Sequence, residues 1–351
     1  MRWGVVSTVC EPAPLVMAFV AHYLELGASR IDLFLDAPDP ALAALLAPLE
    51  RVHVTQQTAR DWRQAGHALP PSPPQRQRIN ARRVYEAGRV DWLLHVDADE
   101  FLTDAAMVLR DVAAMPDEVD YVGLWPLERV RDRDRPESTL FEGAFRRLVT
   151  AERQAQIAPV YGDALRFLDW GLSSNGRIKA FVRSGRALDI DLHEPARRDG
   201  GAAVGRLIEA PVLLHFDGMT EANYTGKLVR KIAQNAGWRA FPAPGRRAQL
   251  AEVAAARGDP TRISALYRSV KTVDPEQAVA LEEQGLLMRV PFDPRTAVAK
   301  TFPGISVDFG CAGFDATPMP QMHLNAATRI ANDLRGRLFQ LRRRLGRRLG
   351  G

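Results

Sequence analysis

Residues 91–102 combine an apolar run with clustered carboxylates, in the order Asp-Trp-Leu-Leu-His-Val-Asp-Ala-Asp-Glu-Phe-Leu. The run up to Val96 has the length of a buried strand, and Asp97, Asp99 and Glu100 follow it directly. Residues two apart on a strand share a face, so the pattern predicts that Asp97 and Asp99 aim at one point while Glu100 points elsewhere. Carboxylates that close repel each other, and a hard divalent cation removes the conflict. The stretch therefore predicts a Mg²⁺ or Mn²⁺ site with Asp97 and Asp99 as ligands, against the alternative of an acidic, solvated strand end.

Two histidines are candidates to complete such a site, and a third is not. His215 ends an apolar run, and His193 lies in a polar turn before Pro195. Neutral imidazole is a common metal ligand, so either residue could bind the metal or contact a diphosphate, with a structural histidine as the alternative. His95 lies inside the central apolar run and is predicted to be structural.

The elements that must position these groups alternate between strand and helix. Strands are expected at 4–9, 31–35, 52–54 and 92–96, and helices at 12–26, 41–49 and 75–87. This alternation predicts an α/β fold with a mainly parallel sheet covered by helices on both faces. Ligands bind beyond the carboxyl ends of such strands, so we expect one crevice to collect the side chains that follow them, namely Cys10, Glu11, Asp36, Asp97 and Asp99.

The second half of the chain has a looser pattern. Strands are expected at 121–125, 178–182 and 212–216, and a charged loop at 128–137. The chain reads as helical from Glu221, and Asp259-Pro260 and Asp274-Pro275 each predict an N-cap followed by proline in the first turn. We expect a catalytic domain over 1–220, a helical region over 221–328 and a basic tail over 329–351.

The composition is that of an ordinary globular protein, with 46% apolar and 25% charged residues. Cys10 and Cys311 are its two cysteines, which predicts no disulfide framework and a reduced, cytoplasmic compartment. No signal peptide is recognisable, and no window holds the roughly 18 apolar residues that span a bilayer.

The positive charge is concentrated at the C-terminus. Residues 329–351 hold eight Arg and one Asp, so this segment has a net charge of +7. The whole chain has a net charge of +5, so the remaining residues sum to −2. Leucines recur there on one helical face, at Leu334, Leu338, Leu341, Leu345 and Leu349. A basic amphipathic helix over 329–349 predicts peripheral contact with a membrane, against packing on a protein surface.

Several segments together resemble bacterial family 2 glycosyltransferases of the GT-A fold, in the branch with an Asp-x-Asp-Glu-Phe signature. The resemblance covers roughly residues 4–235, and the acidic stretch is its most specific part. The other matching positions are Phe19–Gly27, Gln77, Lys179, His193-Glu194-Pro195 and Leu214-His215-Phe216. The sequence departs from the family pattern in two segments that are implied to contact the nucleotide. Cys10-Glu11 replaces the family's Asn-Glu, and Asp36-Ala37-Pro38-Asp39 replaces its Asp-Asn-x-Ser.

The resemblance implies an inverting, metal-dependent transfer of a sugar from a nucleotide-diphosphate sugar, first of all a UDP-sugar, in cell-envelope polysaccharide synthesis. The acceptor would be a glycan or a lipid-linked molecule. The residues implied to bind the nucleotide-sugar are Cys10, Glu11, Asp36, Gln77, Asp97, Lys179 and His193. Asp97, Asp99 and His215 would hold Mn²⁺ or Mg²⁺, with Asp99 also counted as catalytic. Glu194 is preferred as general base over Asp191 and Asp217.

Two other classes use similar residues. A nucleotidyltransferase or phosphohydrolase could employ the same acids, although Cys10-Glu11-Pro12 is not a glycine-rich, basic loop. A non-catalytic carbohydrate-binding domain could keep the fold. No phosphate-loop motif is present, and the arginine-rich tail lacks the aromatic residues that would favour nucleic acid.

Overall fold

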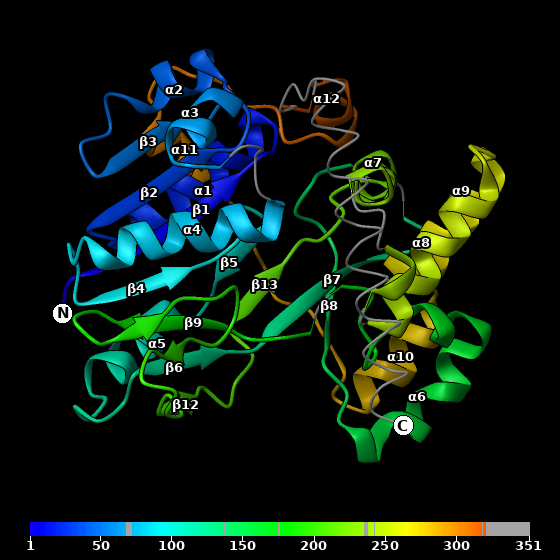
Figure 1. Ribbon diagram of the computed structural model, residues 1–351. Helices are drawn as coiled ribbons and strands as arrows, with labels where there is room; N and C mark the ends of the chain where they lie inside the picture. The colour runs from blue at the N-terminus through cyan, green and yellow to red at the C-terminus, as the bar shows by residue number, and fades with distance from the viewer. Residues whose placement is uncertain are drawn as a thin grey trace, which may run out of the picture. The chain divides into compact units, whose positions relative to one another are not determined.

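The computed structural model describes residues 1–67, 72–135, 138–174, 176–234, 238–241, 243–317 and 319–320. These residues form two compact units, each built from separate stretches of chain (Figure 1). Unit 1 comprises Met1–Leu127, Arg177–His215 and the described residues from Phe292 to Pro320, and unit 2 comprises the described residues of Glu128–Gly176 and Phe216–Pro291. The chain crosses between the two units after Leu127, Gly176, His215 and Pro291.

Unit 1 is built on a seven-stranded sheet with the strand order β12-β6-β9-β4-β1-β2-β3. The strands are β1 (Trp3–Val9), β2 (Arg30–Leu35), β3 (Val52–Gln56), β4 (Trp92–His95), β6 (Tyr121–Leu124), β9 (Lys179–Arg183) and β12 (Gly205–Leu207). The first four are parallel to one another, and β12 is parallel to β6, whereas β9 runs antiparallel between β4 and β6. The predicted α/β class with a mainly parallel sheet is confirmed.

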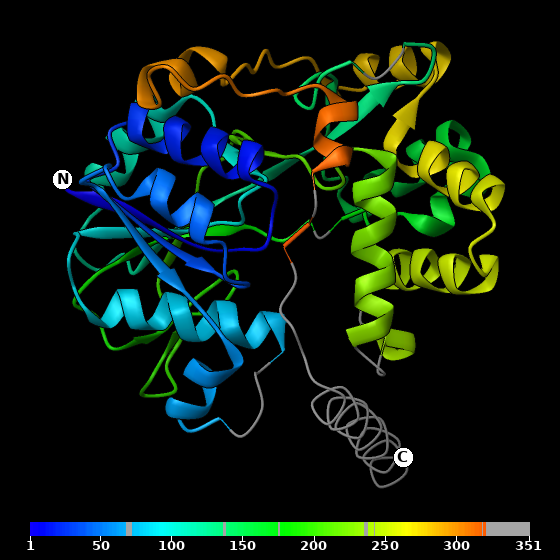
Figure 2. The same ribbon diagram turned by 90° about the horizontal axis from the view of Figure 1, so that it is seen from above.

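Helices cover both faces of this sheet. Figure 2 shows α1 in deep blue with α11 in orange on one side of the strands, and α4 in cyan on the other. The helices of unit 1 are α1 (Ala13–Glu25), α2 (Pro40–Leu46), α3 (Ala59–Gln64), α4 (Pro73–Glu86), α5 (Ala105–Ala113), α11 (Arg295–Thr301) and α12 (Cys311–Ala316). Proline in the first turn starts α1, α2 and α4, and Gly27, at φ +86°, follows the end of α1 in the left-handed conformation.

Two neighbouring antiparallel strands of a six-stranded sheet bring two distant segments of unit 1 together. β5 (Glu100–Leu102) pairs with β13 (Leu213–His215), and the register places His215 opposite Glu100. The acidic stretch and the predicted histidine strand are therefore adjacent in space although more than a hundred residues separate them in sequence. A second small pair joins β10 (Leu188–Asp189) to β11 (Ala196–Arg197).

Unit 2 combines short strands with helices around one apolar core. Its strands are β7 (Pro126–Asp132), which begins two residues before the unit, β8 (Ala144–Arg147), β14 (Thr272–Val273) and β15 (Leu287–Met288). Its helices are α6 (Gln154–Tyr161), α7 (Glu221–Gln234), α8 (Pro244–Ala256), α9 (Pro260–Lys271) and α10 (Pro275–Glu283), with short 3₁₀ turns η1 (Ala151–Arg153), η2 (Gly162–Phe167) and η3 (Trp238–Ala240). The Asp259 and Asp274 carboxylates accept N-cap hydrogen bonds, as predicted.

The charged loop expected over 128–137 is the one clear error of element type, because its first half is strand β7. Glu128, Arg129 and Arg131 are buried, with exposed fractions of 0%, 1% and 4%. Their charges meet opposite charges and backbone carbonyls inside unit 2, a compensation that a hydrophobic pattern does not reveal.

Two further expectations concern the membrane. Within the residues described above, no helix is long and apolar enough to cross a bilayer. The predicted amphipathic tail over 329–351 lies outside the described residues.

Candidate functional site

The carboxyl ends of β1, β2 and β4 lie at one edge of the sheet in unit 1. The three strands are parallel and in register, with Val5 opposite both Ile31 and Leu94. The backbone N–H of Asp36 donates to the carbonyl of Val9 at 2.9 Å, which joins the first residue beyond β2 to the end of β1. The sequence therefore predicted correctly that the polar residues after these strands share one edge.

The acidic stretch departs from the predicted strand geometry. β4 ends at His95, residues 98–99 form a turn, and β5 begins at Glu100. The backbone N–H of Asp97 donates to Glu100 Oε2 at 2.8 Å, so these two residues face each other across the turn. The expectation that Glu100 points away from the site is wrong, because two-residue alternation holds only while the chain stays extended.

Lys179 joins Asp97 and Glu100 in a triad in which the lysine and Glu100 are buried and Asp97 is partly exposed. Its Nζ lies 2.8 Å from Asp97 Oδ2 and 3.2 Å from Glu100 Oε2, and the lysine is 4% exposed. Gln77 of α4 donates to Asp97 Oδ1 at 2.6 Å, so both Asp97 oxygens already have partners. Lys179, a predicted diphosphate contact, is thus first of all the counter-ion of the acidic stretch.

The triad shifts the pKa of each member. Burial opposes the charged forms of Asp97 and Lys179, but their mutual attraction outweighs it, so the pKa of Asp97 is held well below its usual value and that of Lys179 is raised. Burial raises the pKa of Glu100 to about 7; Lys179 opposes this rise and the Asp97 charge adds to it. At neutral pH, Lys179 and Asp97 are therefore an ion pair.

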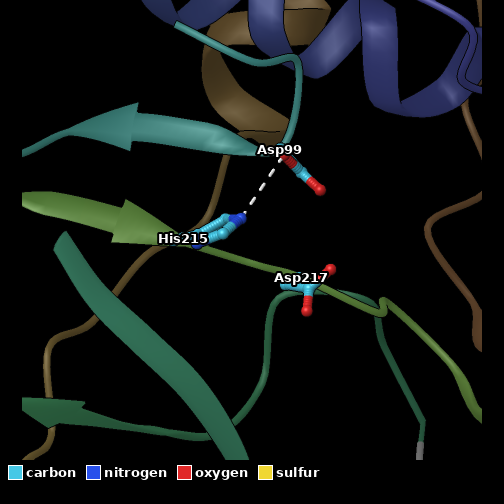
Figure 3. A group of neighbouring side chains, drawn as sticks. All are labelled: Asp99, His215 and Asp217. Carbon is cyan, nitrogen blue, oxygen red and sulfur yellow. Dashed lines mark ion pairs between the residues drawn. The ribbon is translucent and has the colours of Figure 1, made fainter. Parts of the chain in front are cut away.

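Asp99 points away from the triad and toward His215. Asp99 Oδ1 lies 3.8 Å from His215 Nε2, and Figure 3 shows the two side chains directed at each other. Asp217 follows His215 by two residues, so the chain keeps this third donor close. Each of the three offers one ligand atom, and these atoms lie within 4.8 Å of one another. Asp217 was predicted only as a possible general base. Its position two residues after His215 is the sequence feature that indicates a third metal-ligand candidate.

Two carboxylates and an imidazole suit Mn²⁺ or Mg²⁺, which prefer oxygen ligands and, for Mn²⁺, accept nitrogen. Asp99 is 5% exposed and Asp217 8% exposed. Carboxylates buried to this extent need a compensating positive charge. Arg246 and Lys271 supply it at Asp217 Oδ2, and a divalent cation would add positive charge between Asp99 and Asp217. The donor set therefore fits a metal on chemical grounds.

His95 and His193 are neutral at physiological pH. Burial lowers the pKa of both to about 4, and the Lys179 charge acts in the same direction. The His95 Nδ1 lies 3.3 Å from the carbonyl of Asp191, and the His193 Nδ1 lies 2.9 Å from the carbonyl of Ile178. A carbonyl can only accept, so both rings carry their proton on Nδ1 and present Nε2 as an acceptor.

The three candidates for the general base have different surroundings. Glu194 is exposed, with Oε2 3.8 Å from the guanidinium of Arg177, and Asp191 is exposed beside Arg78 at 3.8 Å. Asp217 is buried and receives a hydrogen bond from Arg246 at 2.7 Å. Glu194 and Asp191 are therefore accessible to an incoming acceptor.

Helix α4 presents a row of polar side chains to the strand ends. Arg76 forms a two-pronged ion pair with Asp36, with distances of 2.6 and 2.5 Å, and Gln77 contacts Asp97 as described. Asn80 bonds Thr8 of β1 at 2.9 Å. Arg76 and Asn80 were not among the residues predicted for the site; Asn80 lies three residues after Gln77, on the same face of the helix.

Cys10 and Glu11 occupy the turn after β1. The Cys10 thiol donates to the carbonyl of Pro320 at 3.1 Å, which brings the last described residue to the end of β1. Glu11 is half-buried in the same turn. The predicted nucleotide-binding residues Cys10, Glu11, Asp36 and Asp97 thus follow neighbouring strands of one unit.

No protein-family model and no curated protein matches the sequence. Among solved structures, the chain is similar to CMP:2-keto-3-deoxy-manno-octonic acid synthetase complexed with CTP, with 14% identity over 36% of this chain and 53% of that chain and a TM-score of 0.25. It is also similar to residues 1–349 of S. aureus TarS, with 13% identity, coverage of 77% and 72%, and a TM-score of 0.33. A third similar structure is glucosyl-3-phosphoglycerate synthase from Mycobacterium tuberculosis in complex with Mg²⁺ and UDP, with 13% identity, coverage of 67% and 81%, and a TM-score of 0.31. The chain spans about half the length of the synthetase, at 53%. At these identities and TM-scores the similarities carry no conclusion about function, which must rest on the residues themselves.

Proposed function

We propose that this chain is a metal-dependent, inverting glycosyltransferase that moves a sugar from a nucleotide-diphosphate sugar to a glycan or lipid-linked acceptor. The observation that carries the proposal is Asp99 facing His215 at 3.8 Å beside the carboxyl edge of a mainly parallel sheet. That edge is where α/β proteins bind nucleotides.

The metal ligands in this proposal are Asp99, His215 and Asp217. Bound Mn²⁺ or Mg²⁺ would neutralise the charge that develops on the departing diphosphate. Asp97, also expected as a ligand, would have to give up Lys179 or Gln77 to reach a metal directly. We therefore assign Asp97 to orientation of the sugar-nucleotide, alongside Lys179.

The nucleotide would bind along the strand ends. Asp36 is paired with Arg76, and a paired carboxylate can still accept hydrogen bonds from ribose hydroxyls. Glu11 and Cys10 lie after the neighbouring strand and would contact the base. His193 presents a neutral imidazole acceptor near Lys179, where it would contact the sugar or diphosphate.

The acceptor hydroxyl needs a base in an inverting transfer, and Glu194 is our assignment. Its carboxylate is on the surface, where an acceptor can reach it, and it lies 3.8 Å from the guanidinium of Arg177. The basic tail over 329–349 would bring a cytoplasmic enzyme to the surface of a membrane that carries a lipid-linked acceptor.

A panel of UDP-, GDP- and TDP-sugars tests the proposal. Purified protein is incubated with each sugar nucleotide in Mn²⁺ or in EDTA, and the nucleotide products are separated. Release of a nucleoside diphosphate in Mn²⁺ alone is the expected result. Release of a nucleoside monophosphate would favour a phosphohydrolase, and stabilisation by a sugar nucleotide without any turnover would favour a binding domain.

A further inference from the structure

The segment that immediately follows His215 is clamped by buried charged side chains of unit 2. We define this segment as residues 216–220, which include the third metal-ligand candidate, Asp217. The Arg129 Nη2 donates to the carbonyls of Gly218 at 2.6 Å and Met219 at 3.0 Å. The Arg131 Nη2 donates to the same Met219 carbonyl at 3.0 Å. The two arginines are two apart on β7, so their side chains share one face of the strand.

The clamp has little freedom to move. Arg129 is 1% exposed and Arg131 is 4% exposed. The Nη1 atom of Arg129 donates to the carbonyl of Leu140 at 3.3 Å. Buried guanidinium groups are costly unless their donors are satisfied, so the loss of these carbonyl partners would be unfavourable. A planar guanidinium also fixes the direction of the carbonyls that it binds.

The backbone on the other side of the segment is equally restricted. Gly218 has φ +72°, and a Cβ there would lie 2.9 Å from the Cβ of Tyr224. The Met219 N–H donates to Asn223 Oδ1 at 3.2 Å, and the Asn223 N–H donates to Thr220 Oγ1 at 3.1 Å. The segment is thus held by side chains of β7 and by the first turn of α7.

The Asp217 side chain is fixed by a second set of cations. Its Oδ2 accepts from Arg246 at 2.7 Å and from Lys271 at 3.3 Å. Lys271 in turn lies 3.6 Å from Glu128, which precedes Arg129 in the same strand. Strand β7 therefore reaches the segment by two routes, one through the backbone and one through the Asp217 carboxylate.

We infer that Arg129 and Arg131 are positioning residues for the metal centre. They fix the backbone after His215, and so set where His215 and Asp217 present their donor atoms. The inference rests on the proposed function for its metal, and it adds a role for β7, which lies far from the acidic stretch in sequence. Partners of metal ligands commonly change metal affinity by about 10–100-fold when they are altered.

The test compares Arg129→Lys with a matched control, Arg133→Lys. The first variant keeps the buried charge but loses the planar fork that spans the two carbonyls. Arg133 has the same side-chain type four residues further along, and it contacts Thr272 and Asp274 instead of the segment. The readouts are the Mn²⁺ dissociation constant, measured by electron paramagnetic resonance of free Mn²⁺, and the unfolding midpoint in EDTA.

We expect Arg129→Lys to weaken Mn²⁺ binding about tenfold or more, and Arg133→Lys to leave it unchanged. Excess Mn²⁺ should restore the wild-type kcat of nucleotide release, because the defect is one of metal affinity. If Arg129→Lys does not fold, Arg131→Lys takes its place with the same expectation.

Wild-type Mn²⁺ affinity in the folded variant would overturn the inference. Protein that binds Mn²⁺ but releases no nucleotide from any sugar nucleotide would refute the proposed function, and the ratio of dissociation constants would still decide the role of Arg129. Wild-type protein that binds no Mn²⁺ would overturn both.

Discussion

Lys179 organises the acidic stretch at the scale of single residues. Its ammonium group lies between Asp97 and Glu100, with Gln77 on the far oxygen of Asp97. Without this cation, two carboxylates would be buried side by side, and both would be driven toward protonation. The internal ion pair thus keeps Asp97 ionised in the absence of a metal.

His95 makes stability depend on pH. It is 4% exposed, and burial lowers its pKa to about 4, from about 6.5 in the unfolded chain. Between these pH values the unfolded state binds more protons than the folded state. The contribution of neutral His95 to the free energy of unfolding is therefore complete above pH 6.5 and is lost as the pH falls toward 4. This pKa shift corresponds to about 3 kcal/mol of unfolding free energy.

We expect His95→Gln to reduce the pH dependence of the unfolding free energy between pH 6.5 and 4, measured by urea denaturation. His22 and His193, whose pKa values are also lowered to about 4, keep their own contributions. The matched control is His53→Gln, at an exposed position of β3. An unchanged pH profile in His95→Gln would show that His95 does not titrate on unfolding in this way.

The candidate site was partly predictable from residue types. Apolar residues that run into Asp97 and Asp99 indicated a strand end with clustered acids, and both residues are found there. The turn at 98–99 was not predictable, because no glycine or proline marks it, and the turn decides that Asp99 meets His215 while Asp97 meets Lys179. Arg76 was missed because its partner, Asp36, is forty residues away.

At the scale of elements, strand β7 links several parts of unit 2. The Glu128 carboxylate accepts from the backbone N–H groups of Ser173 at 3.0 Å and Ser174 at 2.6 Å, and it pairs with Arg146 of β8. Lys271 of α9 is the next cation, at 3.6 Å. The charged side chains of β7 form ion pairs and hydrogen bonds inside unit 2, which explains why a buried strand has a charged sequence.

Glu128→Gln should therefore destabilise unit 2 strongly. Glu128 is 0% exposed, and its loss as an anion removes the counter-charge of Arg146 and leaves Lys271 paired with Asp217 alone. Breaking a buried ion pair from one side costs about 3–5 kcal/mol. Glu283→Gln, at an exposed position of α10, should change the unfolding free energy by less than about 0.5 kcal/mol. Urea denaturation compares the two, and equal stability would mean that the network is not important for folding.

The elements of unit 1 were predictable because their signals are local. Alternating apolar runs, Pro12 to Pro14 before α1, and Gly27 after it predicted β1, α1 and β2 within one or two residues. The sheet order and the antiparallel insertion of β9 depend on contacts between residues far apart in sequence, and no local pattern encodes them.

At the scale of the whole molecule, the charge distribution separates the tail from the rest of the chain. Residues 329–351 carry +7 against −2 for all other residues. Leucines on one helical face with arginines on the others predict binding to anionic lipid, and each basic residue near such a surface contributes about 1 kcal/mol.

We expect full-length protein to co-sediment with anionic liposomes, and high salt to weaken this because surface charges are screened. Truncation after Thr328 should abolish sedimentation and leave transfer to a soluble acceptor intact. Equal liposome binding by the truncated protein would rule out the tail as the membrane contact.

The most direct test of the proposed metal-dependent transfer measures the release of nucleoside diphosphate by Asp99→Asn in the presence of Mn²⁺. Wild-type protein and Asp191→Asn are the comparisons. Asp99 faces His215, whereas Asp191 is an exposed carboxylate in the same unit. Asn keeps the shape of the side chain and removes its charge, so the fold should survive. Asp99→Asn should be folded but should no longer bind Mn²⁺ tightly. Its turnover should fall at least a hundredfold, roughly the effect of removing one group that stabilises a developing charge. Asp191→Asn should retain most of its activity. Full turnover in Asp99→Asn, or in wild-type protein with excess EDTA, would contradict it.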